Sequence, residues 1–150
     1  WGRPDMALFK FTRAMLAGEP IDVYGHGQLV RDFTYIDDIV EGVLRVLDKP
    51  ATPDATYDPA APHPGTSSAP YRIFNIGNST PTVLMDYIAA IEQALGRTAE
   101  KRLLPVQPGD VQATSADTSA LAAWVGFAPA TPVGQGVERF VQWYREFYKL

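Results

Sequence analysis

Cysteine is absent from this chain of 150 residues. Without it the chain cannot carry a disulfide framework, a cysteine-ligated zinc ion, an iron–sulfur cluster or a thiol nucleophile. Histidine is scarce as well, since His26 and His63 are the only two, and most histidine-based metal sites need more ligands than that. We therefore expect no metal site on this chain.

The chain also lacks a basic block and a long apolar run. Thirteen Lys and Arg residues against seventeen Asp and Glu residues give a formal net charge of −4, which argues against binding to nucleic acid or to an anionic membrane. A membrane-spanning helix needs a run of about 18 apolar residues, and a secretory signal needs a basic and an apolar region. Neither is present, so we expect a cytoplasmic protein. The chain starts at Trp1 rather than Met, which favours a fragment of a longer protein over a naturally short one.

The familiar motifs of catalysis and cofactor binding are missing too. The one G-x-G, Gly25-His26-Gly27, has neither the third glycine nor the following helix that would place a pyrophosphate at a helix N-terminus. It is therefore interpreted as a turn. No tyrosine is followed four residues later by lysine, and no G-x-S-x-G, H-E-x-x-H or P-loop occurs.

The apolar residues that are present recur at helical and strand spacings. They predict helices over residues 5–17, 35–48, 80–95, 117–124 and 133–148. They predict short strands over residues 21–24, 71–76 and 101–104, with a proline-rich loop at 50–70. Helix starts are expected at Asp5, Thr80 and Asp117, and helix ends at Gly18, Gly96 and Gly126. The pattern indicates α/β or α+β layering in a single domain over residues 1–150.

Two of these helices have marked apolar faces, which normally pack on a core. The face of the 35–48 helix carries Ile36, Ile39, Val40, Val43, Leu44 and Leu47. The last helix is expected to bury Val137, Phe140, Val141, Tyr144, and either Phe147 or Tyr148.

Arg31 is the first candidate for a binding residue. It follows a glycine-containing turn, and its guanidinium offers the two-pronged donor geometry that suits a phosphate. An ion pair with Asp32, Asp37 or Asp38 explains the same position equally well. The residues alone leave both interpretations open.

Three other polar residues also have a ligand interpretation and a plainer one. Gln107 and Asp110 would present an amide and a carboxylate to sugar hydroxyls, although Gln107-Pro108-Gly109-Asp110 is also typical of a surface turn. Asn75 ends a predicted strand, where ligands often bind in α/β proteins, but its side chain is equally suited to bonding the backbone.

Five sequence runs, taken together and in order, carry more information than the residues taken singly. They are W-G-R-P-D-M-A (1–7), I-D-V-Y-G (21–25), R-D-F-T-Y-I-D-D-I-V-E-G (31–42), F-N-I-G-N (74–78) and Q-P-G-D-V (107–111). The chain resembles the C-terminal, substrate-binding half of an extended short-chain dehydrogenase/reductase. The first and last runs resemble those of its UDP-glucuronate 4-epimerase subgroup.

The resemblance implies a fold and a division of labour. An N-terminal Rossmann domain, missing from this chain, would bind NAD and carry the catalytic Ser/Thr, Tyr and Lys set. This chain would supply the nucleotide-sugar-binding part, about five helices with a few short strands and no cofactor of its own. The resemblance thus implies an isomerase in the full-length protein, expected to be a homodimer, whereas this chain alone is expected to be inactive.

The resemblance also assigns roles to individual residues. Arg31 matches the arginine that holds the diphosphate, and Asp110 matches the carboxylate that bonds the ribose hydroxyls. Val23 and Tyr24 match the segment that meets the base, partly through backbone groups. Three further candidates for substrate binding are Gln107, at a second phosphate position where many members have arginine, Arg3, near the sugar, and Asn75.

The implied reaction is C4 epimerisation of UDP-glucuronate to UDP-galacturonate. The C4 hydroxyl is oxidised while its hydride passes to NAD, the 4-keto sugar turns within the site, and the hydride returns to the other face. The alternatives are another nucleotide-sugar epimerase or dehydratase of the same superfamily, and a non-catalytic module that binds nucleotide sugars.

Overall fold

The computed structural model describes residues 5–150 of the chain. Their contacts divide the chain into two compact units, each assembled from stretches that are separate in the sequence. Unit 1 comprises Trp1–Phe33, Thr80–Ser115 and Thr131–Leu150, and unit 2 comprises Thr34–Ser79 and Ala116–Ala130. The expectation of one domain over residues 1–150 stays a prediction.

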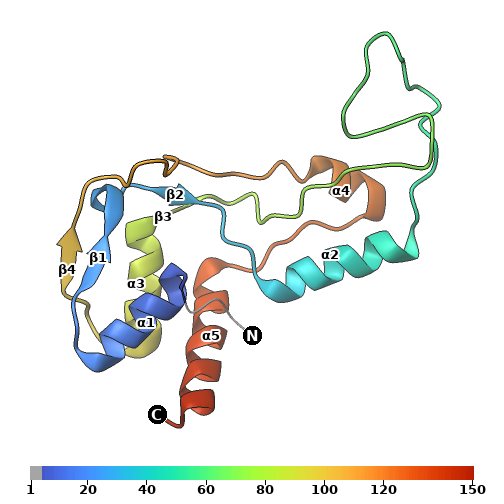
Figure 1. Cartoon of the computed structure of the whole chain (residues 1–150). Coiled ribbons are helices and arrows are strands. Elements are labelled where there is room, and N and C mark those ends of the chain that lie inside the picture. Colours follow the sequence, from blue (N-terminus) through green and yellow to red (C-terminus); the bar gives the residue numbers. More distant parts are fainter. Residues whose placement is uncertain (1–4) are drawn as a thin grey trace. The chain divides into compact units, whose positions relative to one another are not determined.

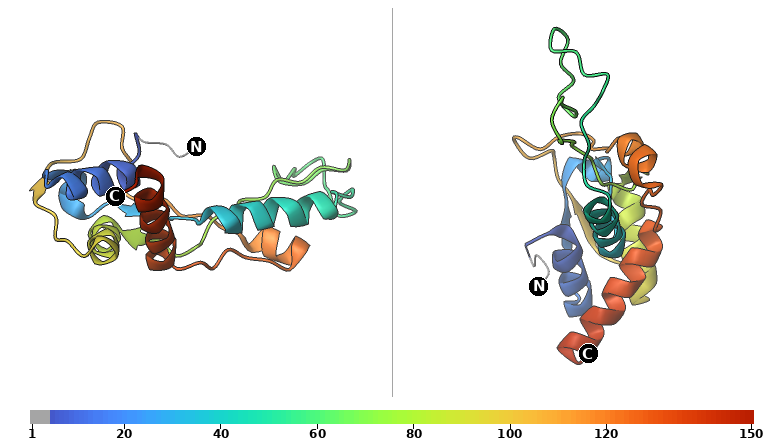
Figure 2. Two further views of the ribbon diagram at one scale, coloured as in Figure 1. Left: turned by 90° about the horizontal axis from the view of Figure 1, so that it is seen from below. Right: turned by 90° about the vertical axis from the view of Figure 1, so that its right-hand side faces the viewer.

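Unit 1 is built on three helices, α1 (Ala7–Ala17), α3 (Leu84–Leu95) and α5 (Val133–Tyr148). Helix α3 packs against both α5 and α1, as the views in Figures 1 and 2 show. Their apolar stripes form the core with β1, and its largest fully buried members include Ile88, Ile91 and Val23. Gly18 and Gly96 end α1 and α3 in the left-handed conformation, as predicted.

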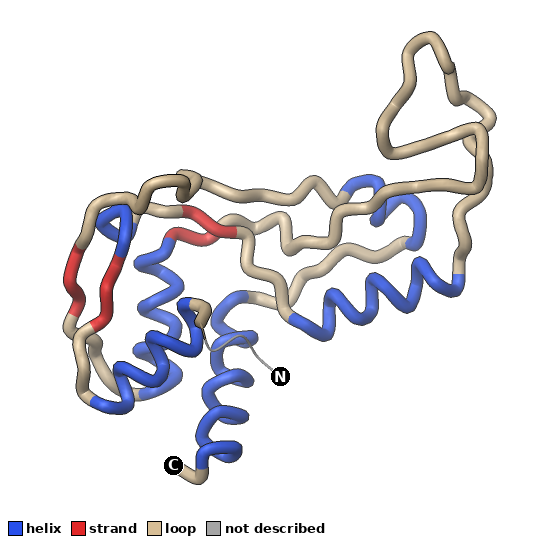
Figure 3. Tube along the Cα trace, in the orientation of Figure 1, coloured by secondary structure: helices blue, strands red, loops and turns tan. Residues whose placement is uncertain are grey.

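The strands of unit 1 are short and form two pairs (Figure 3). Strand β1 (Ile21–Val23) pairs in parallel with β4 (Lys101–Leu103), and β2 (Val30–Arg31) pairs antiparallel with β3 (Thr82–Val83). A 3-10 turn, η1 (Tyr24–Gly27), links β1 to the β2 stretch. Gln112–Thr114 runs beside β2 and makes an isolated parallel bridge through Val30 and Ala113.

The predicted start of α3 at Thr80 was wrong. The β-branched residues Thr82 and Val83 pair with β2, so the helix begins only at Leu84. The Leu84 N–H also donates to the Leu29 carbonyl at 2.8 Å. Pairing with a distant strand therefore overrides the local helix signal.

Unit 2 contains α2 (Ile36–Asp48) and α4 (Ser119–Val125), and residues 50–70 form the predicted long loop (Figure 3). Asp117 was expected to cap α4, but Thr118 occupies the N-cap position of that helix. Asp117, one residue earlier, accepts a hydrogen bond from the Ser119 N–H at its Oδ1 at 2.9 Å. Gly126 ends that helix in the left-handed conformation.

The strand predicted at residues 71–76 does not form a ladder. The stretch is extended, and the structure gives it an isolated bridge between Thr66 and Arg72. A strand needs a neighbour to pair with, and local sequence pattern says nothing about whether one is at hand.

Two smaller predictions were also wrong. Met6, rather than Asp5, occupies the N-cap position of α1. Phe147 and Tyr148 are both exposed, because Val137, Val141 and Tyr144 provide the buried positions of α5. Within residues 5–150, no helix is both long and apolar enough to cross a bilayer.

Candidate functional site

A cavity of about 340 Å³ lies in unit 1. It brings together the start of α1, the residues around β1 and β2, and the segment that follows the Gln107–Asp110 turn. Its walls combine apolar side chains with one arginine and three aspartates. The lining residues are Met6, Ala7, Phe11, Asp22, Tyr24, Leu29, Arg31, Asp32, Phe33, Leu84, Asp110 and Thr114.

Arg31 is held from several directions at the wall of this cavity. Its Nη2 pairs with Asp110 Oδ1 at 2.5 Å. Its Nη1 donates to the Val30 carbonyl at 2.8 Å and reaches the Gln112 carbonyl at 3.5 Å. The side chains of Arg31 and Asp110 are only 25% and 32% exposed. The ion-pair interpretation of Arg31 thus has a definite partner, but that partner is Asp110, 79 residues further along the chain.

Backbone pairing explains why Asp110 reaches Arg31. The Val30 N–H donates to the Gln112 carbonyl at 3.0 Å, and the Thr114 N–H donates to the Val30 carbonyl at 3.1 Å. The segment leaves a turn in which the Asp110 N–H donates to the Gln107 carbonyl at 3.1 Å. These bonds fix the register between the segment and β2, and that register places the carboxylate against the guanidinium.

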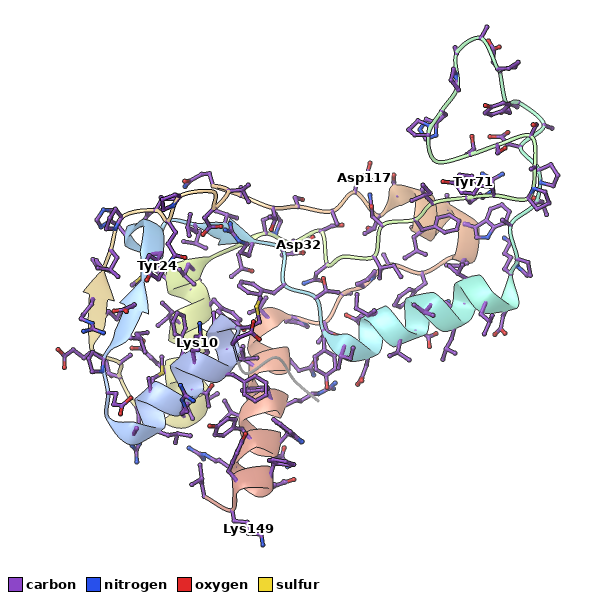
Figure 4. The ribbon with its side chains drawn as sticks, in the orientation of Figure 1. Lys10, Tyr24, Asp32, Tyr71, Asp117 and Lys149 are labelled. Carbon is purple, nitrogen blue, oxygen red and sulfur yellow. The ribbon has the colours of Figure 1, made fainter. Side chains whose placement is uncertain are left out.

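Tyr24, which is labelled in Figure 4, also lines this cavity. It begins η1, in which Gly25, His26 and Gly27 all have positive φ. Gly27 is required there, since a Cβ at this position would lie 2.5 Å from Met85 Cγ. Val23, directly before Tyr24, has a fully buried side chain, and its carbonyl accepts the Leu104 N–H at 2.9 Å.

The remaining predicted residues are not brought to this cavity wall. Gln107 lies in the turn described above and is not among the lining residues. Asn75 belongs to unit 2, where its Nδ2 donates to the Asp117 carbonyl at 3.2 Å and it lines a separate cavity of about 380 Å³. Arg3 lies outside the described residues.

The structure adds lining residues that sequence reasoning did not single out as site residues, among them Asp22, Asp32, Phe33 and Thr114. Phe33 stacks on Tyr87 with ring centroids 3.9 Å apart, which fixes one apolar wall. Burial raises the pKa of the Tyr87 phenol, so this ring remains neutral. Asp32 and Phe33 lie in the R-D-F-T-Y run, so this motif could have indicated them as site residues. Thr114 lies in an irregular stretch, and no sequence motif marks it as a site residue.

The loop at Gly25–Gly27 does not fit the pyrophosphate of NAD. Such a group binds at the N-terminus of a helix that follows a glycine-rich turn. Here the glycines lie inside η1, and the next element is β2. Among residues 5–150, no cluster of three His, Cys, Asp or Glu side chains is placed to hold a metal ion.

Comparison with known proteins gives relatives across the whole chain. The chain is 58% identical over 150 residues to an uncharacterized 37.6 kDa protein of Escherichia coli O111:H-, of which it covers 45%. It is 45% identical to a probable UDP-glucuronate 4-epimerase of Rhizobium meliloti, with 99% of this chain and 44% of that protein covered. The chain therefore spans less than half the length of these relatives.

A solved structure has the same fold. It is UDP-glucuronic acid 4-epimerase from Bacillus cereus in complex with UDP-glucuronic acid and NAD, matched with a TM-score of 0.77 and 27% identity over 97% of this chain and 41% of that one. The five helices and few short strands of residues 5–150 correspond to the C-terminal portion of extended short-chain dehydrogenase/reductase epimerases. The model of the NAD dependent epimerase/dehydratase family matches residues 2–77, and the chain belongs to that family.

Proposed function

We propose that this chain is the substrate-binding part of a nucleotide-sugar epimerase that converts UDP-glucuronate to UDP-galacturonate. The observation that carries the proposal is the meeting at one cavity of Tyr24 and Arg31, from one stretch of chain, with Asp110 from a distant one. The names of the Rhizobium meliloti and Bacillus cereus relatives support the choice of UDP-glucuronate as substrate.

Each residue has a role suited to its chemistry. Arg31 binds the diphosphate, because a guanidinium makes short, charge-assisted hydrogen bonds to phosphate oxygens. Asp110 accepts hydrogen bonds from the ribose hydroxyls, and Tyr24 lies against the base with the backbone of Val23. The apolar wall of Phe33, Leu29 and Phe11 excludes water from the ligand, which strengthens these polar contacts.

Holding the diphosphate while leaving the sugar free is what a 4-epimerase requires. The sugar ring must present first one face and then the other without leaving the protein. The described residues of this chain bind and orient the ligand. NAD supplies the oxidation and reduction, and we assign its binding to a part of the protein outside this chain, because the Gly25–Gly27 loop does not fit it.

Activity of the natural polypeptide that contains this sequence tests the proposal. We expect conversion of UDP-glucuronate to UDP-galacturonate in the presence of NAD, at a kcat/KM well above those for UDP-glucose and dTDP-glucose. Arg31→Ala should raise KM, and kcat/KM should fall at least about tenfold, since a charge-assisted pair contributes roughly 1.5–3 kcal/mol. A preference for dTDP-glucose would indicate a dehydratase, and binding of UDP-sugars without turnover would indicate a non-catalytic module.

A further inference from the structure

Thr114 makes two hydrogen bonds that lie on either side of Arg31. Its N–H donates to the Val30 carbonyl at 3.1 Å, and its Oγ1 accepts from the Asp32 N–H at 3.3 Å. Val30 and Asp32 directly precede and follow Arg31 in the chain. A single residue, distant in the sequence, therefore holds the backbone on both sides of the arginine that we assign to the diphosphate.

The segment that contains Thr114 depends on hydrogen bonds for its position. Residues 111–115 are all exposed, so burial of apolar side chains does not fix them. Besides the bonds at Thr114, the Gln112 carbonyl accepts the Val30 N–H at 3.0 Å, and the Gln112 side-chain amide reaches the Gln28 carbonyl at 3.4 Å. Segments held by hydrogen bonds that are open to water are prone to local opening. Loss of one of these bonds should therefore loosen the segment.

Asp110 directly precedes this segment and depends on it for its position. Its carboxylate meets Arg31 because the segment runs beside β2 in the register of the Val30–Ala113 bridge. A loosened segment would let the carboxylate and the guanidinium move independently of each other. Affinity for a ligand that needs both groups would then fall, because binding would also have to order them.

Thr114 lines the cavity as well, so contact with the ligand and positioning of Arg31 are both open to it. Its hydroxyl oxygen is already engaged by the Asp32 N–H, which favours positioning. We propose that Thr114 is a positioning residue, whose hydroxyl keeps Arg31 and Asp110 in the geometry that binds a nucleoside diphosphate. The inference rests on the proposed function of the cavity and adds to it a residue that acts through Arg31.

Thr114→Val tests the role of the hydroxyl, because valine keeps the branched shape and removes the acceptor oxygen. In the natural polypeptide, UDP binding measured by calorimetric titration should weaken about three- to tenfold, the usual effect of losing one uncharged hydrogen bond. KM for the nucleotide sugar should rise by a similar factor with kcat unchanged, since NAD supplies the oxidation and reduction. Thr114→Ser keeps the hydroxyl and should restore most of the affinity.

Ser115→Ala is the matched control, because it removes the hydroxyl of the next residue, which is exposed and does not line the cavity. This control should bind UDP as the parent protein does. Thr114→Ala is measured as a second variant and should show the same loss as Thr114→Val, so the result does not depend on how one variant folds. Circular dichroism verifies that each variant is folded.

An Arg31→Ala protein distinguishes positioning from direct contact. The pair that the Thr114 hydroxyl holds is already broken there, so Thr114→Val should change the UDP affinity by less than about twofold. An equal loss with and without Arg31 would overturn the proposal, since Thr114 would then contact the ligand itself.

Two further outcomes separate this proposal from the proposed function. Full UDP affinity in a folded Thr114→Val protein, while Arg31→Ala binds UDP weakly, would overturn the role of Thr114 and leave the proposed function standing. Full UDP affinity in a folded Arg31→Ala protein would contradict the proposed function, and the role of Thr114 with it.

Discussion

Arg31 and Asp110 are 79 residues apart in the chain, yet their side chains form an ion pair with 2.5 Å between Nη2 and Oδ1. The pair lies at the wall of the unit 1 cavity. Asp110 therefore neutralises the cation that we assign to the diphosphate. The diphosphate of a ligand that binds there competes with the Asp110 carboxylate for the guanidinium. The ribose hydroxyls of the same ligand donate hydrogen bonds to that carboxylate.

Asp110→Asn separates the neutralisation of Arg31 from the binding of the ribose hydroxyls. The substitution removes the charge of Asp110 but keeps its shape and one acceptor oxygen. In the natural polypeptide we expect weaker binding of UDP, which has a ribose, and unchanged or stronger binding of inorganic pyrophosphate, which has none. The ratio of the two Kd values should change by about tenfold, from the loss of a hydrogen bond to a charged group. Calorimetric titration measures both, and an unchanged ratio would contradict the role of Asp110.

Gly27 is predicted to be essential to the loop that presents Tyr24. Gly27 has φ +78°, and an added Cβ would lie 2.5 Å from Met85 Cγ, whereas Gly18 has φ +73° and nothing within 4 Å. Both Gly→Ala changes incur backbone strain of about 1 kcal/mol. Gly27→Ala adds a steric clash and should lower the free energy of unfolding by a further 1–3 kcal/mol or so. Urea denaturation measures both variants, and an equal loss of unfolding free energy in Gly27→Ala and Gly18→Ala would show that Met85 moves away from the added Cβ.

The Glu92–Lys101 ion pair predicts a pH dependence of stability. Burial raises the pKa of Glu92, but hydrogen bonds from the Lys101 side chain and the Ala99 N–H outweigh it and hold the pKa below its ordinary value of 4.5. A carboxyl whose pKa is lowered by folding stabilises the protein above its unfolded pKa, and this contribution is lost as the pH falls through the folded pKa.

Glu92→Gln should therefore destabilise the protein near neutral pH, and the difference from the parent should shrink as the pH falls below about 4.5. Urea denaturation of both proteins across this pH range measures the difference. A difference that stays constant with pH would mean that the ionised carboxylate contributes nothing.

Helix ends were the most predictable part of the fold. Gly18, Gly96 and Gly126 each end a helix in the left-handed conformation, which is a local property of glycine. Predictions failed where pairing over long distances decides the structure. Thr82 and Val83 leave the predicted helix because β2 pairs with them, and residues 71–76 have a strand pattern without a ladder.

In the site too, local sequence features could be predicted and long-range contacts could not. Arg31 stood out by its residue type and its place after a turn, but its ion-pair partner did not, since spacing in the sequence says nothing about a contact with Asp110. The family resemblance indicated both residues and Tyr24, and all three line one cavity. Their roles in substrate binding stay predictions, as do those of Val23, Gln107, Asn75 and Arg3.

Binding of UDP to Arg31 variants tests the central claim most directly. In the natural polypeptide, Arg31→Ala should weaken UDP binding at least about tenfold, and Arg31→Lys should recover only part of the loss, because lysine keeps the charge but not the two-pronged geometry. Circular dichroism would verify that both variants fold. Full affinity for UDP in a folded Arg31→Ala protein would contradict the assignment of this cavity to the nucleotide sugar.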